Sequence, residues 1–191
     1  MTASEALQRL KDGNARFAAG ASTRRDWLDL SGGQHPFATI LGCSDSRVPP
    51  EILFDAGLGD LFIVRVAGNV VGAEILGSLG YELEHLRTPL FVVLGHERCG
   101  AVQAALQGKL HGLKEQRTIA ELIDVILPAL TEINPSEPAE QQWHHAVEAN
   151  VRWAVRQLAE TPGGRDAVEA QQIELIGAVY ELATGRVRFL E

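Results

Sequence analysis

Cysteine and long apolar segments are scarce in this chain, and each scarcity excludes a class of protein. Only two of its 191 residues are cysteines, so no disulfide framework can hold it together, which is typical of a reducing compartment. No stretch approaches the roughly 18 apolar residues of a membrane-spanning helix. The first residues also lack the apolar run of a signal peptide. We therefore expect a cytoplasmic protein that does not reside in a membrane.

Basic residues are also in the minority. Lysine and arginine together number 17, against 25 aspartates and glutamates, which gives a formal net charge of −8. A negative surface argues against nucleic acid or an anionic membrane as a partner. The length fits one domain with a sizeable core. We predict a single domain over residues 1–191, with an N-terminal helical arm at 1–30 and an α/β core at 36–191.

Expected strands alternate with expected helices along the chain. The apolar runs Phe37–Leu41 and Leu90–Leu94, each followed by glycine, are typical of strands buried in a parallel sheet. The pattern predicts an α/β fold with a mostly parallel sheet, about four parallel strands plus an antiparallel edge strand, flanked by helices. The other expected strands cover 61–66, 173–180 and 187–190. The expected helices cover 2–19, 70–87, 100–106, a segment starting at Thr118 with a capping box to Glu121, and 141–160.

Both cysteines lie in motifs that offer metal ligands. Cys43 opens the segment Cys43–Arg47 (Cys-Ser-Asp-Ser-Arg), and Cys99 closes His96–Cys99 (His-Glu-Arg-Cys). Taken singly, either motif is a weak metal signal, because buried free cysteines are common. However, each follows a predicted parallel strand, and ligands bind beyond the carboxyl ends of such strands. Three protein ligands with an open fourth position are the pattern of catalytic zinc. We predict that Cys43, His96 and Cys99 hold Zn²⁺.

Asp45 and Arg47 lie two residues apart beside the first predicted ligand, where their side chains can form a bidentate ion pair. A purely structural salt bridge is the alternative interpretation. Next to a metal we favour a catalytic role. Asp45 would accept a hydrogen bond from zinc-bound hydroxide and orient it toward the substrate, while Arg47 would keep Asp45 ionised and directed away from the metal. Asp45 would become a ligand itself only if the site closes.

The paired motifs resemble the signature of the β-class carbonic anhydrases. Cys43–Arg47 is followed about fifty residues later by Gly95–Gly100, and the likeness extends over Ala6–Leu190. The resemblance implies reversible hydration of CO₂ to bicarbonate and a proton by zinc-bound hydroxide. It also implies a homodimer at least, with a dimer of dimers as the larger assembly. In some family members the aspartate at the position of Asp45 becomes a fourth zinc ligand.

The resemblance also implies a substrate pocket. Gln34 matches a substrate-binding glutamine of plant-type members, and Phe62 and Tyr81 match pocket walls, some of which come across a subunit interface. The ordinary alternatives are an exposed glutamine and two core aromatics. The backbone N–H of Gly100, at a predicted helix start, is a candidate donor to bicarbonate. Ala67 replaces a larger residue of the plant-type enzymes, which predicts a roomier pocket.

The N-terminal helix presents a narrow apolar stripe that must lie on something. Thr2 and Glu5 form a capping-box pattern, and Ala6 and Leu10 fall on one face. The stripe can pack on its own domain or, as in family members, across a neighbouring subunit. We expect the second arrangement.

Two other functions fit the same residues. One is hydrolysis of CS₂ or COS on this scaffold, since these linear molecules offer a similar electrophilic carbon. The other is a non-enzymatic zinc-binding structural or regulatory module, in which Asp45 permanently completes the coordination sphere. Arg47 argues against the module, because it gives Asp45 a competing partner.

Overall fold

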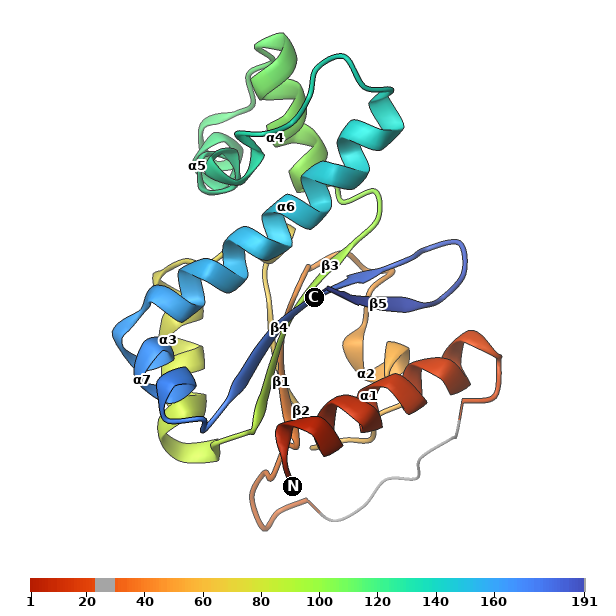
Figure 1. The fold of residues 1–191 in the computed structure, drawn as a ribbon, viewed down its shortest axis with the longest axis vertical. Coiled ribbons are helices and arrows are strands. Elements are labelled where there is room, and N and C mark those ends of the chain that lie inside the picture. The colour runs from red at the N-terminus through yellow and green to blue at the C-terminus, as the bar shows by residue number, and fades with distance from the viewer. Residues whose placement is uncertain (23–29, 191) are drawn as a thin grey trace.

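A five-stranded sheet forms the centre of the computed structural model, which describes residues 1–22 and 30–190 (Figure 1). The strand order is β2-β1-β3-β4-β5. The first four strands are parallel and β5 pairs antiparallel with β4. The predicted fold class is therefore confirmed. The strands are β1 (Ala38–Gly42), β2 (Leu61–Arg65), β3 (Leu90–His96), β4 (Glu174–Tyr180) and β5 (Val187–Leu190).

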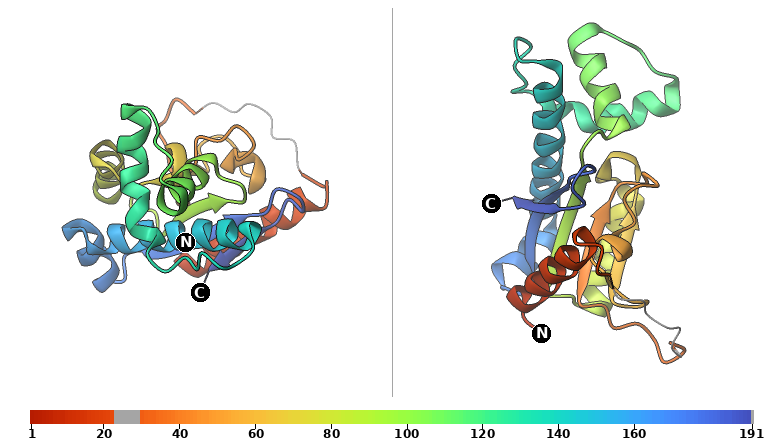
Figure 2. Two further views of the ribbon diagram at one scale, coloured as in Figure 1. Left: turned by 90° about the horizontal axis from the view of Figure 1, so that it is seen from above. Right: turned by 90° about the vertical axis from the view of Figure 1, so that its right-hand side faces the viewer.

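Helices cover both faces of the sheet, which explains why every residue of β1 and β3 is buried. One hydrophobic cluster joins the sheet to α3 through α7, and the other joins it to α1 and α2. Figures 1 and 2 show that α4, α5 and the first half of α6 extend beyond the sheet. The helices are α1 (Ala3–Ala18), α2 (Pro50–Leu53), α3 (Ala73–Tyr81), α4 (Gly100–His111), α5 (Arg117–Ile126), α6 (Ala139–Glu160) and α7 (Pro162–Glu169).

Several helix boundaries differ from those expected. The helix predicted over 70–87 is α3 followed by a π-helical turn, Glu82–Leu86. The predicted start at Thr118 is wrong, because α5 begins at Arg117 and its N-cap, Gln116, makes no side-chain capping bond. The helix expected over 100–106 continues to His111 and ends at Gly112, whose φ of +67° suits a glycine C-cap. Helices α2 and α7 are not expected from the sequence, because they are too short to show a helical period.

Helix α1 lies on its own chain. The capping box between Thr2 and Glu5 is present as predicted. However, Ala6 and Leu10 are fully buried against the sheet and α2, and Gly13 approaches Phe54 so closely that a Cβ would lie 1.8 Å from its carbonyl oxygen. The prediction that the apolar stripe covers a neighbouring subunit is therefore wrong. Of the predicted arm, 1–30, residues 23–29 lie outside the described part of the chain.

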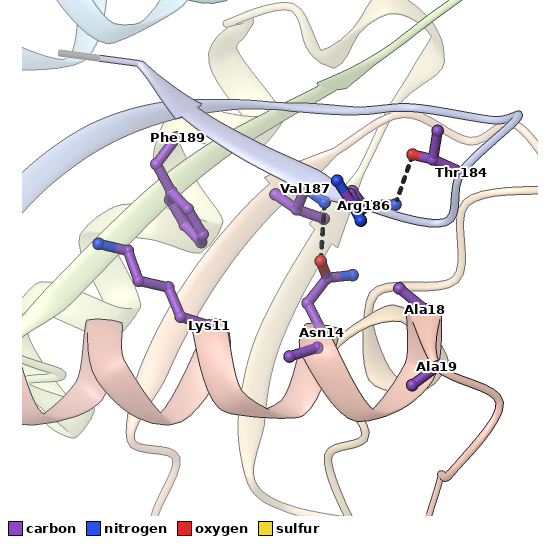
Figure 3. Close-up of a pocket in the computed structure, with 9 residues that line it drawn as sticks. Lys11, Asn14, Ala18, Ala19, Thr184, Arg186, Val187 and Phe189 are labelled. Atoms are coloured by element: carbon purple, nitrogen blue, oxygen red, sulfur yellow. Dashed lines mark hydrogen bonds between the residues drawn. The ribbon is translucent and has the colours of Figure 1, made fainter.

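Asn14 fastens α1 to two other elements, and Figure 3 shows its bond to one of them, at Val187. The side chain of Asn14 is buried. Nδ2 donates to the carbonyl oxygens of Leu53 at 3.0 Å and Gly185 at 2.9 Å, and Oδ1 accepts from the backbone N–H of Val187 at 2.8 Å. The bond to Val187 satisfies a backbone donor of the edge strand β5, which protects that edge from other strands. A pocket of about 690 Å³ between α1 and β5 lies beside this amide.

No helix within residues 1–22 and 30–190 is long and apolar enough to cross a membrane.

Asn14→Ala is expected to lower the free energy of unfolding by about 2–3 kcal/mol, because it leaves one buried and two half-buried backbone groups without partners. Denaturant unfolding followed by circular dichroism measures this change. Gln8→Ala is the matched control, since Gln8 is an exposed amide of the same helix that bonds to Asp12 on the helix surface, and its effect should stay within about 0.5 kcal/mol. Equal effects of the two variants would contradict the fastening role of Asn14.

Candidate metal centre

The fold brings the three predicted metal ligands together at the carboxyl edge of the sheet. Cys43 directly follows β1, His96 ends β3, and these strands are neighbours. Cys99 is the N-cap residue of α4, three positions after His96. The Sγ atoms of Cys43 and Cys99 lie 4.0 Å apart. Both Sγ atoms and one ring nitrogen of His96 lie within 4.8 Å of one another, and all three residues are buried.

The donor set fits a tetrahedral soft cation. Zn–S bonds of 2.3 Å at tetrahedral angles place two sulfurs about 3.8 Å apart, close to the observed separation. His96 Nδ1 bonds to the carbonyl oxygen of Glu97 at 2.8 Å, which leaves Nε2 for the metal. This Nε2 is buried and has no hydrogen-bond partner among the described residues. Buried polar atoms are rarely unpaired, so Nε2 is a candidate metal ligand.

The ionisation of the two thiols also favours a cation at this position. The close contact with the Cys99 thiol, and then the neighbouring His96 ring and nearby backbone amides, lower the pKa of Cys43 despite its burial. The pKa of Cys99 is raised, first by its bond with Cys43 and then by burial. Two buried thiolates in contact repel each other, so both ionise together only when a cation lies between them.

Asp45 and Arg47 form the predicted ion pair. Arg47 donates from Nε to Oδ1 at 2.9 Å and from Nη2 to Oδ2 at 2.7 Å, and its backbone N–H donates to Oδ1 at 2.9 Å. The side-chain bonds from Arg47 hold the pKa of Asp45 well below its usual range, so Asp45 is ionised at neutral pH. Oδ2 lies 3.9 Å from His96 Nε2. The carboxylate therefore borders the metal position while Arg47 holds both of its oxygens.

Two residues outside the predicted metal centre brace its loops. Arg65, at the end of β2, donates to the carbonyl oxygens of Cys43 at 2.9 Å and Asp45 at 2.6 Å. Trp143, on α6, donates from Nε1 to the carbonyl oxygen of Cys99 at 3.3 Å. Both act on backbone atoms of residues far away in the sequence. Residue spacing therefore contains no signal of either contact.

The predicted substrate residues divide between the two edges of the sheet. Gly100 is the first residue of α4 and adjoins Cys99, as expected. Gln34 instead precedes β1 and is exposed. Phe62 pairs with Thr39 of the neighbouring strand. Thr39 precedes Cys43 by four residues, so Phe62 lies about 13 Å from Cys43 along the strand direction. Tyr81 ends α3, stacks near Phe62 at 6.4 Å between ring centroids, and is 49% exposed. One chain therefore does not bring Gln34, Phe62 and Tyr81 to its own metal ligands.

A parallel α/β sheet with a Cys₂His centre and an aspartate–arginine pair at its carboxyl edge defines a class of metalloenzyme. The sequence model of the family described as "Carbonic anhydrase" matches residues 38–187. This chain belongs to that family, in its β class, and is thereby an enzyme of the carbonate dehydratase type.

Known relatives cover most of the chain. A carbonic anhydrase of Mycolicibacterium smegmatis is 37% identical over 95% of this chain and 90% of its own length. Carbonic anhydrase 2 of Mycobacterium tuberculosis is 35% identical over 95% of this chain and 89% of its own. Among solved structures, the β-carbonic anhydrase CafA of Aspergillus fumigatus is similar with a TM-score of 0.79 and 27% identity, over 98% of this chain and 90% of that one.

Proposed function

We propose that this chain binds one Zn²⁺ through Cys43, His96 and Cys99 and catalyses the reversible hydration of CO₂ to bicarbonate and a proton. The observation that carries the proposal is the convergence of three buried ligand atoms, one of them an unpaired imidazole nitrogen, beside a preformed Asp45–Arg47 pair. When bound, zinc lowers the pKa of its water to about 7 and so supplies hydroxide; carbonic anhydrase with three histidine ligands is the standard example of this effect.

The residues of the chain then orient the reactants. Ionised Asp45 accepts a hydrogen bond from the attacking water, which directs an oxygen lone pair at the carbon of CO₂. Arg47 fixes the carboxylate in that orientation through two parallel bonds. Arg65 holds the carbonyl oxygens on either side of Ser44, so that Cys43 and Asp45 keep their separation. The N–H of Gly100, at the start of α4, is placed to donate to a bicarbonate oxygen.

The position of Asp45 supports an open fourth coordination site. Arg47 occupies both carboxylate oxygens, so Asp45 must break these bonds before it can ligate the metal. A structural module in which Asp45 permanently completes the coordination sphere would need the opposite arrangement. We therefore favour the enzyme with Asp45 as an orienting group.

We further propose that the substrate pocket is completed by a second copy of the chain, in a homodimer or a dimer of dimers. Phe62 and Tyr81 stack near each other at the edge of the sheet opposite the ligands of their own chain, and Gln34 is an exposed residue just before β1, so we expect all three to serve the metal centre of another subunit. The half-exposed ring of Tyr81 is available for such a contact. We also place the enzyme in the cytoplasm, because its two cysteines are free thiols.

Stopped-flow hydration of CO₂ by the zinc-loaded protein tests this function. We expect CO₂ hydration to far outpace hydrolysis of CS₂ or COS, and Gln34→Ala to lower kcat/KM by about tenfold through the loss of one directing hydrogen bond, with unchanged zinc content. Gln8→Ala, in an exposed helix position, should change neither value. Faster turnover of CS₂ or COS would instead identify a sulfur-compound hydrolase on the same scaffold.

A further inference from the structure

The sulfur of Cys43 receives a hydrogen bond from the backbone. The N–H of Gly68 donates to Cys43 Sγ at 3.3 Å. Gly68 has a φ of +69°, a left-handed conformation that favours glycine. A Cβ at this position would lie 2.9 Å from Ile126 Cδ1 and 3.2 Å from Ala101 Cβ. The short turn after β2 is therefore shaped so that its amide points at a metal-binding sulfur.

A side chain from a distant helix holds this turn in place. Asn150, on α6, donates from Nδ2 to the carbonyl oxygen of Gly68 at 2.8 Å. Asn150 is 2% exposed and lies on the buried face of α6, between Val147 and Val151. A polar amide on such a face is costly unless it is hydrogen-bonded. The contact with Gly68 gives the amide a partner and joins α6 to the metal centre.

We propose that Asn150 is a positioning residue of the metal centre, which holds the Gly68 turn so that its N–H stabilises the Cys43 thiolate as a zinc ligand. This inference rests on the proposed zinc function. The N–H···S bond withdraws charge from the sulfur, and partners of this kind set both metal affinity and ligand geometry. Two thiolates place more negative charge on zinc than neutral imidazoles do, so this bond counteracts an excess of charge on the metal.

Asn150→Leu tests the proposal, because leucine has a similar volume and cannot donate to Gly68. We expect zinc affinity to fall by about 10–100-fold, measured on the full chain by competition with a chromogenic chelator. In the Co²⁺-substituted protein, the thiolate-to-cobalt charge-transfer band should move to longer wavelength, because the sulfur of Cys43 loses its hydrogen bond. Asn150→Ala, which removes the donor without risk of overpacking, should give the same two changes if the leucine variant does not fold.

Gln142→Leu is the matched control. Gln142 is a second buried amide of α6, and its Nε2 bonds to the carbonyl oxygens of Pro135 and Glu137 rather than to that of Gly68. We expect this variant to melt lower, as the Asn150 variants should, but to keep the zinc affinity and cobalt spectrum of the original protein. Asn150 variants with undiminished zinc affinity would overturn the positioning role while leaving the proposed function intact. An original protein that binds no zinc would overturn both.

Discussion

His96→Ala is expected to reduce the zinc content from one ion per chain to nearly none and to lower CO₂ hydration by more than about 1000-fold. The expected loss exceeds the 10–100-fold that removal of a residue behind a metal ligand typically causes, because Nε2 of His96 is itself a ligand in our proposal. The variant should also melt at a lower temperature, since metal binding contributes directly to folding free energy. Metal analysis, stopped-flow kinetics and thermal melting measure the three effects.

His145→Ala is the control for the loss of an imidazole. His145 lies on the surface of α6, and its half-exposed side chain pairs with Glu137, which precedes the helix. This variant should keep its zinc and its activity. If the original protein, purified without chelators, contained iron or no metal, or if the His96 variant retained zinc, the assignment of the metal centre would be wrong.

Arg47→Ala is expected to lower CO₂ hydration by about 10–100-fold at unchanged zinc content. The change removes both side-chain bonds that hold the Asp45 carboxylate, so Asp45 no longer orients water and is free to bind the metal. Arg47→Lys should restore only part of the activity, because an ammonium group cannot form the parallel bonds of a guanidinium. Stopped-flow kinetics measures the loss, and a crystal structure of the zinc-loaded variant shows where the carboxylate lies.

Arg117→Ala controls for the loss of a surface charge. Arg117 is almost fully exposed and pairs with Glu121 one turn along α5, so its removal should change the rate by no more than about twofold. An Arg47 variant as active as this control would contradict the orienting role. In the original protein near neutral pH, an Asp45 oxygen within about 2.2 Å of zinc would show that the site is closed rather than open.

The sequence was sufficient to predict the sheet and the convergence of Cys43, His96 and Cys99. The apolar runs ending at Leu41 and Leu94 are followed within two residues by Cys43 and His96. Parallel neighbouring strands must present their carboxyl ends at one edge, so the meeting of these residues follows from the strand pattern alone. The Asp45–Arg47 pair was equally predictable, because both partners lie in one short turn and need no distant contact.

Short or distant features could not be predicted in the same way. The four residues of α2 contain barely one helical turn, so no period is detectable. The first turn of α5 was misplaced because Thr118 and Glu121 have the spacing of a capping box, although the helix begins before them. The apolar stripe on α1 predicts that some surface covers it. The hydrophobic effect is non-directional, so it does not specify whether that surface belongs to the same chain or to another subunit. Only the close approach of Gly13 to Phe54 decided that the surface belongs to its own chain.

The sequence by itself therefore determined the fold class, the three residues that can hold a metal and the charged pair beside them, because each depends on local patterns or on the fixed geometry of parallel strands. The tertiary structure alone decided which residues support that centre. Arg65, Trp143 and Asn150 act on backbone atoms of residues 20 to 82 positions away, and backbone groups are identical at every residue. It also separated Gln34, Phe62 and Tyr81 from their own ligands, because the length of a strand keeps its two ends apart.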